Sequence, residues 1–143
     1  MRDDLQLISQ WIPKGATLLD LGCGDGTLLA WLGEHKQAQG YGLEINQDNL
    51  AACFEKGVNV LEQDLDGGLG NFQNHRFDYV VMTQALQAVL RPDQILNEMV
   101  RVGREAIITF PNFGHWKIRA YLGLKGRMPV SSALPYEWYN TPN

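Results

Sequence analysis

Residues 18–26 read LLDLGCGDG, an apolar run that passes directly into three glycines at alternate positions. The run has the composition of a buried β-strand, and the stretch after it places Leu28, Leu29 and Leu32 on one helical face. Glycines at such a junction tolerate positive φ angles and let a ligand approach the backbone, while the following helix offers unpaired N–H groups. This order of strand, glycine loop and helix predicts a nucleotide-binding unit.

Further apolar runs and helical patterns alternate along the rest of the chain. We expect strands at residues 17–21, 40–44, 58–62, 77–82 and 106–110, and helices at residues 26–35, 47–56 and 92–102. A leading helix at about residues 3–12 is expected to be capped by an acidic residue and to stop near Pro13. Strands that alternate with helices predict an α/β fold with a doubly wound, mostly parallel Rossmann-like sheet, whose ligands bind at the carboxyl ends of the strands.

The spacing of the glycines bears on which nucleotide binds. A dinucleotide fingerprint, G-x-G-x-x-G, needs glycine at the position that Thr27 occupies, which disfavours NAD or FAD. Asp20 stands two places before the first glycine, where a carboxylate repels a pyrophosphate but accepts hydrogen bonds from an ammonium group. S-adenosylmethionine carries an ammonium and a sulfonium, so the loop favours this cofactor. Taken alone, the glycines could instead make only a tight turn between strand and helix.

Polar residues also follow the later strands. Glu44 ends the second strand at the offset from Gly24 where a carboxylate can take both ribose hydroxyls. Asp64, after the third strand, is placed to accept from the adenine amino group, with Leu65 available to cover the ring. The residues from Thr83 onward, after the fourth strand, would border the methionine end. These residues in register make a simple structural turn the weaker interpretation.

Length and composition limit the function classes. The chain has 143 residues, a formal net charge of −4 and 45% hydrophobic residues, which indicates one compact domain and argues against a nucleic-acid partner. No apolar run approaches the roughly 20 residues of a membrane span, so no membrane association is expected. The only cysteines, Cys23 and Cys53, lack metal or disulfide spacing, and the histidines are scattered, so no metal is expected. A reduced, cytoplasmic location is the default.

Charge divides the chain into two parts. Residues 1–112 carry a net −7, and we assign them to the cofactor-binding Rossmann-like domain. Residues 113–127 carry +4 together with aromatic residues such as Trp116 and Tyr121. We assign residues 113–143 to a basic aromatic segment and Pro-containing tail of the same domain. The basic segment suits a solvated helix, a lid for an acidic substrate or a docking surface for another protein, because interfaces are enriched in aromatic and arginine side chains.

Four motifs in order, LLDLGCGDG, YGLEI, EQDL and FDYVVMTQAL, resemble the class I S-adenosylmethionine-dependent methyltransferases. The later stretches FPNFGHW and RMPVSSALPYEWYNTPN are similar to the MetW family of methionine biosynthesis. The fold of this class adds an antiparallel strand pair after the fifth strand, which we expect this chain to lack. The predicted cofactor contacts are Asp20, Gly22, Cys23, Gly24, Glu44, Ile45, Asp64, Leu65 and Thr83.

The resemblance leaves two functions open. It implies an accessory or regulatory protein that binds S-adenosylmethionine or S-adenosylhomocysteine and supports homoserine O-acylation through contact with the homoserine O-acyltransferase. The alternative is an active methyltransferase for a small metabolite, with residues 83–87 facing the acceptor. Methyl transfer from a sulfonium mainly needs an in-line approach, so the lack of an obvious base does not exclude activity. Catalytic residues and the acceptor stay unassigned.

Overall fold

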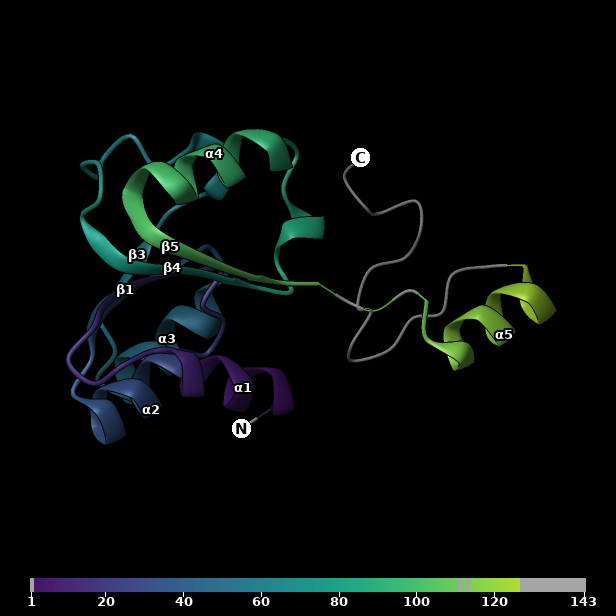
Figure 1. Ribbon diagram of the computed structural model, residues 1–143, viewed down its shortest axis with the longest axis horizontal. Helices are drawn as coiled ribbons and strands as arrows, with labels where there is room; N and C mark the ends of the chain where they lie inside the picture. The colour runs from purple at the N-terminus through teal and green to yellow at the C-terminus, as the bar shows by residue number, and fades with distance from the viewer. Residues whose placement is uncertain (1, 111, 113, 127–143) are drawn as a thin grey trace.

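The computed structural model describes residues 2–110, 112 and 114–126. Its centre is a sheet of five strands: β1 (Thr17–Leu21), β2 (Gln39–Glu44), β3 (Val60–Glu62), β4 (Phe77–Thr83) and β5 (Gly103–Thr109). All neighbouring strands are parallel, in the order β3-β2-β1-β4-β5 (Figure 1). The order reverses between β1 and β4, which makes their carboxyl ends the switch point where such sheets bind ligands. The predicted doubly wound α/β sheet is confirmed.

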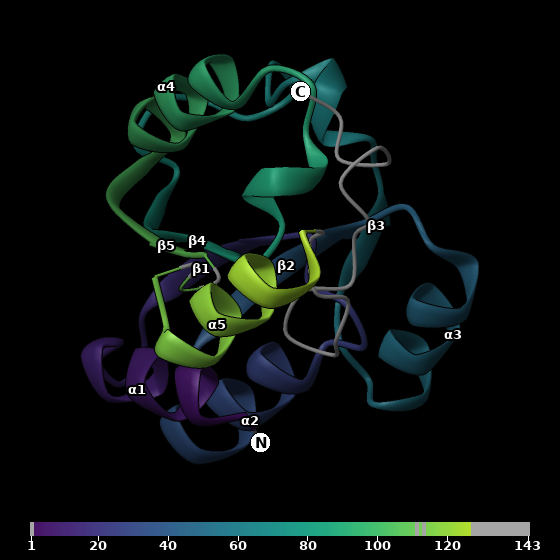
Figure 2. The ribbon, with the colours of Figure 1, turned by 90° about the vertical axis from the view of Figure 1, so that its right-hand side faces the viewer.

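Helices cover both faces of the sheet. The helices α1 (Asp3–Trp11), α2 (Thr27–Lys36) and α3 (Gln47–Glu55) lie on one face, and α4 (Pro92–Val102) lies on the other (Figure 2). Two short 3₁₀ turns, η1 (Leu65–Gly67) and η2 (Leu86–Ala88), follow β3 and β4. The basic segment contains a further helix, α5 (Trp116–Lys125), which has no buried residue and stands apart from the two layers. Residues 127–143, together with Pro111 and Phe113 of the FPNFGHW stretch, lie outside the described residues.

Two strand starts differ from the sequence expectations by more than one residue, and one helix cap also differs. Strand β5 begins earlier, at Gly103, because α4 runs into it without a loop. Strand β3 begins later, because the N–H of Val58 still donates to Cys53 O in the turn after α3. The expected acidic cap of α1 is wrong: the capping position is Arg2, whose side chain makes no capping hydrogen bond to the described residues. Asp3 and Asp4 lie in the first turn instead, where their negative charges interact favourably with the helix dipole.

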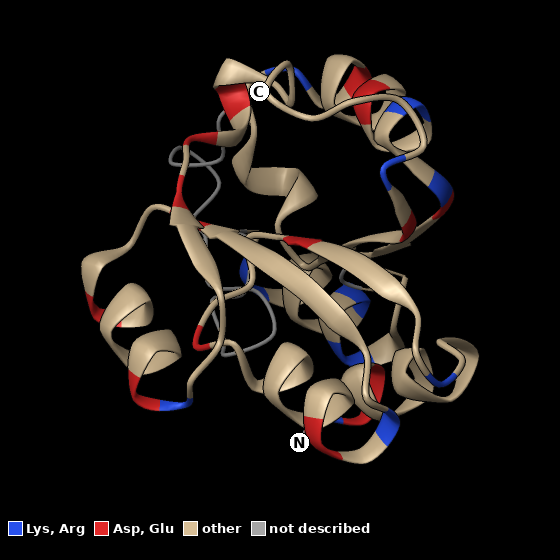
Figure 3. Cartoon of the chain, turned by 90° about the vertical axis from the view of Figure 1, so that its left-hand side faces the viewer, with Lys and Arg blue, Asp and Glu red and all other residues tan. Residues whose placement is uncertain are grey.

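Apolar clusters pack on each face of the sheet. The first joins α1, α2 and β1 through residues such as Ile8, Leu18 and Leu32, and the second joins β4 and α4 through Val80 and Met99. Charged residues lie mainly on helices and loops, while the strands are uncharged over most of their length (Figure 3). No helix in the described part of the chain is both long and apolar enough to cross a bilayer.

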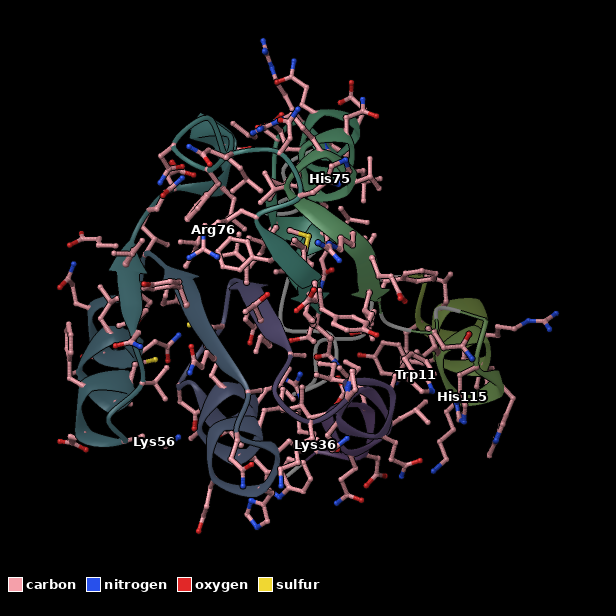
Figure 4. All side chains as sticks on the ribbon, turned by 60° about the vertical axis from the view of Figure 1, so that its left-hand side comes forward. Trp11, Lys36, Lys56, His75, Arg76 and His115 are labelled. Carbon is pink, nitrogen blue, oxygen red and sulfur yellow. The ribbon has the colours of Figure 1, made fainter. Side chains whose placement is uncertain are left out.

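The C-terminal end of α1 is held by a side chain of the neighbouring helix. Lys36 on α2 donates from Nζ to the carbonyl oxygens of Ser9 and Ile12 at the end of α1 (Figure 4). Trp11, also near the end of α1, has 55% of its surface exposed. The buried stripe of α1 runs through Leu5 and Ile8 instead. The hydrogen bonds from Lys36 therefore hold the end of α1 in place, although Trp11 does not pack there.

The connection from β3 to β4 contains no α-helix and is held by α4. Arg101 donates to the carbonyl oxygens of Leu69 and Phe72, both at 2.9 Å, and its guanidinium also pairs with Glu98. Glu98 in turn accepts from the N–H of Leu69 at 3.2 Å. Because these bonds satisfy the backbone of an irregular loop, residues near η1 can form a fixed wall beside the carboxyl ends of the strands.

Candidate functional site

The glycine loop takes the backbone conformation that its sequence predicts. Gly22, Gly24 and Gly26 have φ angles of +68°, +57° and +73°. The N–H groups of Gly22 and Cys23 donate to Leu43 O at 2.8 and 3.1 Å, so the loop is attached to the end of β2. A Cβ added at Gly24 would meet no atom within 4 Å. The open space beside Gly24 is where a ligand can approach the backbone.

A trough runs along the carboxyl ends of β1 to β4. It consists of two pockets of about 530 Å³ each, which share the lining residues Arg2, Gly22, Gly24, Asn49 and Thr83. Its walls bring together every residue that the sequence predicts for the cofactor: Asp20, Gly22, Cys23, Gly24, Glu44, Ile45, Asp64, Leu65 and Thr83. A larger pocket of about 670 Å³ lies at the opposite ends of the strands, but none of the unpaired buried polar atoms among the described residues lines it. The trough is therefore the better candidate site.

Asp20 is the most unusual group in the trough. Asp20 lies one residue before the end of β1, with only 1% of its surface exposed, and its Oδ1 accepts no hydrogen bond from the described residues. Burial raises the pKa of Asp20 to about 7, the nearby Arg2 charge opposes that rise, and Glu44 adds to it. A buried acceptor without a partner is costly unless a ligand completes it. A ligand with a cationic donor fits this position.

Glu44 occupies its predicted place at the end of β2 but is already hydrogen-bonded. Its Oε1 accepts from the N–H groups of Ile45 and Asn46, at 2.8 and 2.9 Å. Its Oε2 accepts from the N–H of Gly24 at 2.9 Å and from Asn49 Nδ2 at 3.2 Å. The carboxylate thus joins the glycine loop to the start of α3. The hydroxyls of a diol could donate to this carboxylate only by displacing one of these donors. The side-chain amide of Asn49 can rotate away, whereas the three backbone N–H groups are fixed.

The remaining predicted residues form the walls of the trough. Asp64 caps η1, accepting from the N–H of Asp66 at 2.9 Å through one carboxylate oxygen, while its Oδ2 has no partner in the part of the chain described. Leu65 is half-buried, and Ile45 is 58% exposed. Both line the same pocket, and aliphatic side chains in a pocket suit the faces of a planar ring.

Cys23 supports the loop rather than offering a nucleophile. Burial raises the pKa of its thiol, and the neighbouring Asp20 charge adds to the effect. Its Sγ lies 3.9 Å from Sγ of Cys53, and a Cβ at Gly42 would come within 2.3 Å of it. A neutral, enclosed thiol is unreactive. Its contribution is to fill the space between the loop, β2 and α3.

Arg2 and Asn49 line both halves of the trough but are not among the residues predicted from the sequence. Arg2 precedes α1, far along the chain from the glycine motif, and no local pattern places it beside Asp20. The position of Asn49 could be inferred from the sequence, because Asn46 is a typical helix-capping residue. It caps α3 and accepts from the N–H groups of Asp48 and Asn49. A side chain in the first turn of that helix must lie near the end of β2. Across the described residues, no group of three His, Cys, Asp or Glu side chains is placed to hold a metal ion.

The parallel sheet, its glycine loop and the carboxylates at the strand ends define a class I S-adenosylmethionine-dependent methyltransferase fold. A SAM-dependent methyltransferase from Thermotoga maritima superposes with a TM-score of 0.68 at 21% identity, covering 86% of this chain and 57% of that one. An N-methyltransferase from Haemonchus contortus, in complex with S-adenosylhomocysteine, superposes with a TM-score of 0.65 at 17% identity, covering 90% and 33% of the two chains.

Within that class, the chain belongs to the MetW family, described as methionine biosynthesis protein MetW, whose match extends over residues 2–143. A bifunctional methionine biosynthesis protein MetXA/MetW from Rhodopirellula baltica is 41% identical over 149 aligned residues. The alignment covers 98% of this chain and 24% of that relative. The chain therefore corresponds to about a quarter of the bifunctional protein.

Proposed function

We propose that the chain binds S-adenosylmethionine and S-adenosylhomocysteine in the trough at the carboxyl ends of the strands. The observation that carries the proposal is the buried carboxyl group of Asp20, which lines the trough and lacks a hydrogen-bond partner among the described residues. The open space at Gly24 fits the same ligand, since it admits a group against the loop backbone. The bound complex of the Haemonchus contortus methyltransferase, which has the same fold, supports this choice of ligand.

Each end of the ligand has a counterpart in the trough. Asp20 would accept from the ammonium group, Glu44 would face the ribose hydroxyls, and Asp64 would accept from the adenine amino group. Ile45 and Leu65 would cover the adenine ring. When bound, S-adenosylmethionine supplies a methyl group activated by its sulfonium. In the alternative function, an active methyltransferase for a small metabolite, residues 83–87 would face the acceptor of that group, and Thr83, Gln84 and Ala85 of this range line the trough.

The accessory function is the one we favour: the chain supports homoserine O-acylation by contacting the acyltransferase. Membership of the MetW family supports a role in methionine biosynthesis. The MetXA/MetW relative joins two methionine biosynthesis parts in one chain, and covalent linkage raises the effective concentration of one part for the other. A cytoplasmic location belongs to the same proposal, because both cysteines are free thiols.

Replacing Gly24 tests the ligand. Gly24→Ala places a methyl group in the trough at a φ of +57°, so we expect affinity for S-adenosylhomocysteine to fall at least about tenfold in calorimetric titration. Gly57→Ala is the matched control, because Gly57 also has a positive φ of +68° and open space, but lies outside the trough. Both variants should lose about 1 kcal/mol of stability from the strained backbone. No heat from either ligand with the unaltered chain would reject the proposal.

Charge reversal on α5 tests the partner. Lys117 and Arg119 lie on a helix that carries no acidic residue, and both are exposed. We expect immobilised homoserine O-acyltransferase to retain the chain and to retain Lys117→Glu/Arg119→Glu at least about tenfold less, as a lost docking contact requires. The control Lys14→Glu/Arg76→Glu reverses two charges elsewhere on the body. Equal retention of both double variants would reject α5 as the docking surface, and no retention of the unaltered chain would reject the partner.

A further inference from the structure

Arg2 brings a positive charge to the pocket that contains Asp20. Its side chain lines both halves of the trough and is half exposed. Its charge also favours the ionised form of Asp20, which shows that the two groups are electrostatically coupled. One pocket therefore presents a buried carboxyl group and, at its rim, a guanidinium. A ligand with both a positive and a negative group would complement this pair.

The guanidinium of Arg2 is held in place yet keeps donors free. Its Nε and Nη2 donate to the two carboxylate oxygens of Asp4, at 3.1 and 3.0 Å. That bidentate pair uses two of the five guanidinium N–H groups. The other three donate to nothing among the described residues, so they can bind a second carboxylate without loss of the first.

Asp4 links this arrangement to the sheet. Its Oδ2 also accepts from Gln84 Nε2 at 3.3 Å, and Gln84 follows directly on β4. Gln84 has a φ of +53°, a backbone conformation that residues other than glycine rarely adopt. Its backbone N–H donates to Thr109 O. The chain of contacts from Gln84 through Asp4 to Arg2 spans the trough from β4 to the start of α1. It fixes the guanidinium over the pocket rather than leaving it free in solvent.

We propose that Arg2 binds the α-carboxylate of the ligand while Asp20 binds its α-ammonium, so that the trough selects ligands with a complete amino-acid end. The proposal rests on the proposed function and assigns Arg2 as a specificity-determining residue of that site. It follows that S-adenosylmethionine and S-adenosylhomocysteine bind well, whereas decarboxylated S-adenosylmethionine, which keeps the ammonium and the sulfonium, binds weakly. Asp4 acts through Arg2 as a positioning residue.

The test compares two ligands on two proteins by calorimetric titration. The unaltered chain should bind S-adenosylmethionine about tenfold more tightly than its decarboxylated form, the size expected for a half-exposed charge-assisted pair. Arg2→Gln should lose that preference, binding S-adenosylmethionine about tenfold more weakly and the decarboxylated form within about twofold of the unaltered chain. Arg76→Gln, a matched change outside the trough, should keep the preference. Asp4→Asn should lose part of it.

Each alternative outcome has a distinct meaning. If Arg2→Gln keeps the full preference for the carboxylated ligand, Arg2 only offsets nearby negative charge and the proposal is overturned while the site stands. If Arg2→Gln weakens both ligands equally, the residue acts on the fold of α1 and the assignment fails. If the unaltered chain binds neither ligand, the proposed function fails with it. Measurement of thermal stability on each variant separates binding loss from unfolding.

Discussion

Asp20→Asn is expected to make the unliganded protein more stable at pH 8 and to weaken its binding of S-adenosylmethionine and S-adenosylhomocysteine strongly. Asp20 is 1% exposed and has a carboxylate oxygen without a partner among the described residues, so its ionised form is costly in the folded state. Asparagine keeps the shape without the charge. The same change removes the negative charge that a cationic ligand needs, and we expect affinity to fall at least about a hundredfold, as for a lost buried charge pair.

The pH dependence has a definite sign. Burial raises the pKa of Asp20 from the ordinary 3.8 to about 7 in the folded protein. Between these values the folded state holds a proton that the unfolded state has lost, so stability declines as pH rises from about 4 to about 7. A tenfold difference in proton affinity between the folded and unfolded states corresponds to roughly 1.4 kcal/mol. The stabilising effect of Asp20→Asn should thus be small at pH 4 and largest at pH 8.

Urea denaturation of both proteins from pH 4 to pH 8 measures this difference. Glu34→Gln is the control, because Glu34 is an exposed carboxylate outside the trough. It should leave stability and binding unchanged at every pH. Ligand affinity of the unaltered chain should rise between pH 6 and pH 8, since Asp20 must ionise to hold an ammonium group. A constant stability difference between Asp20→Asn and the unaltered chain across this range would contradict a raised pKa.

Local sequence patterns predicted the parts of the fold that depend on burial and turn geometry. Glycines at positions 22 and 24 were interpreted as tolerating positive φ angles, and the structure has such angles there. The apolar strands and the face through Leu28 and Leu32 pack as their periodicity indicates. Because parallel strands end at one edge of the sheet, the residue after each strand could be assigned to a common site. The side chain of Asp64 lies there, although it also caps η1.

Local sequence patterns could not predict contacts between segments that are distant along the chain. Arg2 reaches the trough only because α1 packs against α2 and the sheet, which no spacing near residue 2 encodes. Trp11 lies on the same helix, but the packing of Ile8 and Leu5 turns it outward. The donors around Glu44 come from two segments of the chain, the glycine loop and the start of α3. Local structure thus determines where along each strand or helix a site residue lies, and tertiary packing determines which of these residues contact one another.

Glu44→Gln is expected to weaken both the fold and the ligand site, since Glu44 carries hydrogen bonds for both. The carboxylate accepts four hydrogen bonds, three of them from backbone N–H groups. Glutamine offers one oxygen, and its NH₂ group would face N–H donors, including that of Gly24. Leaving two donors unpaired in a site that is 9% exposed should lower the free energy of unfolding by about 2–4 kcal/mol. Affinity for S-adenosylhomocysteine should fall at least about thirtyfold, because the glycine loop loses its attachment to β2 and α3.

Glu62 provides the matched control for this substitution. It is the register partner of Glu44 on the neighbouring strand β3, but it is exposed and accepts only from Gln47 Nε2, at 2.9 Å, among the described residues. Glu62→Gln should change stability by less than about 0.5 kcal/mol and leave binding intact. If Glu44→Gln loses affinity at unchanged stability, the carboxylate acts by direct contact with the ribose alone. If it loses stability and keeps affinity, Glu44 is a structural clamp of the loop, and the ribose must be held by other groups of the trough.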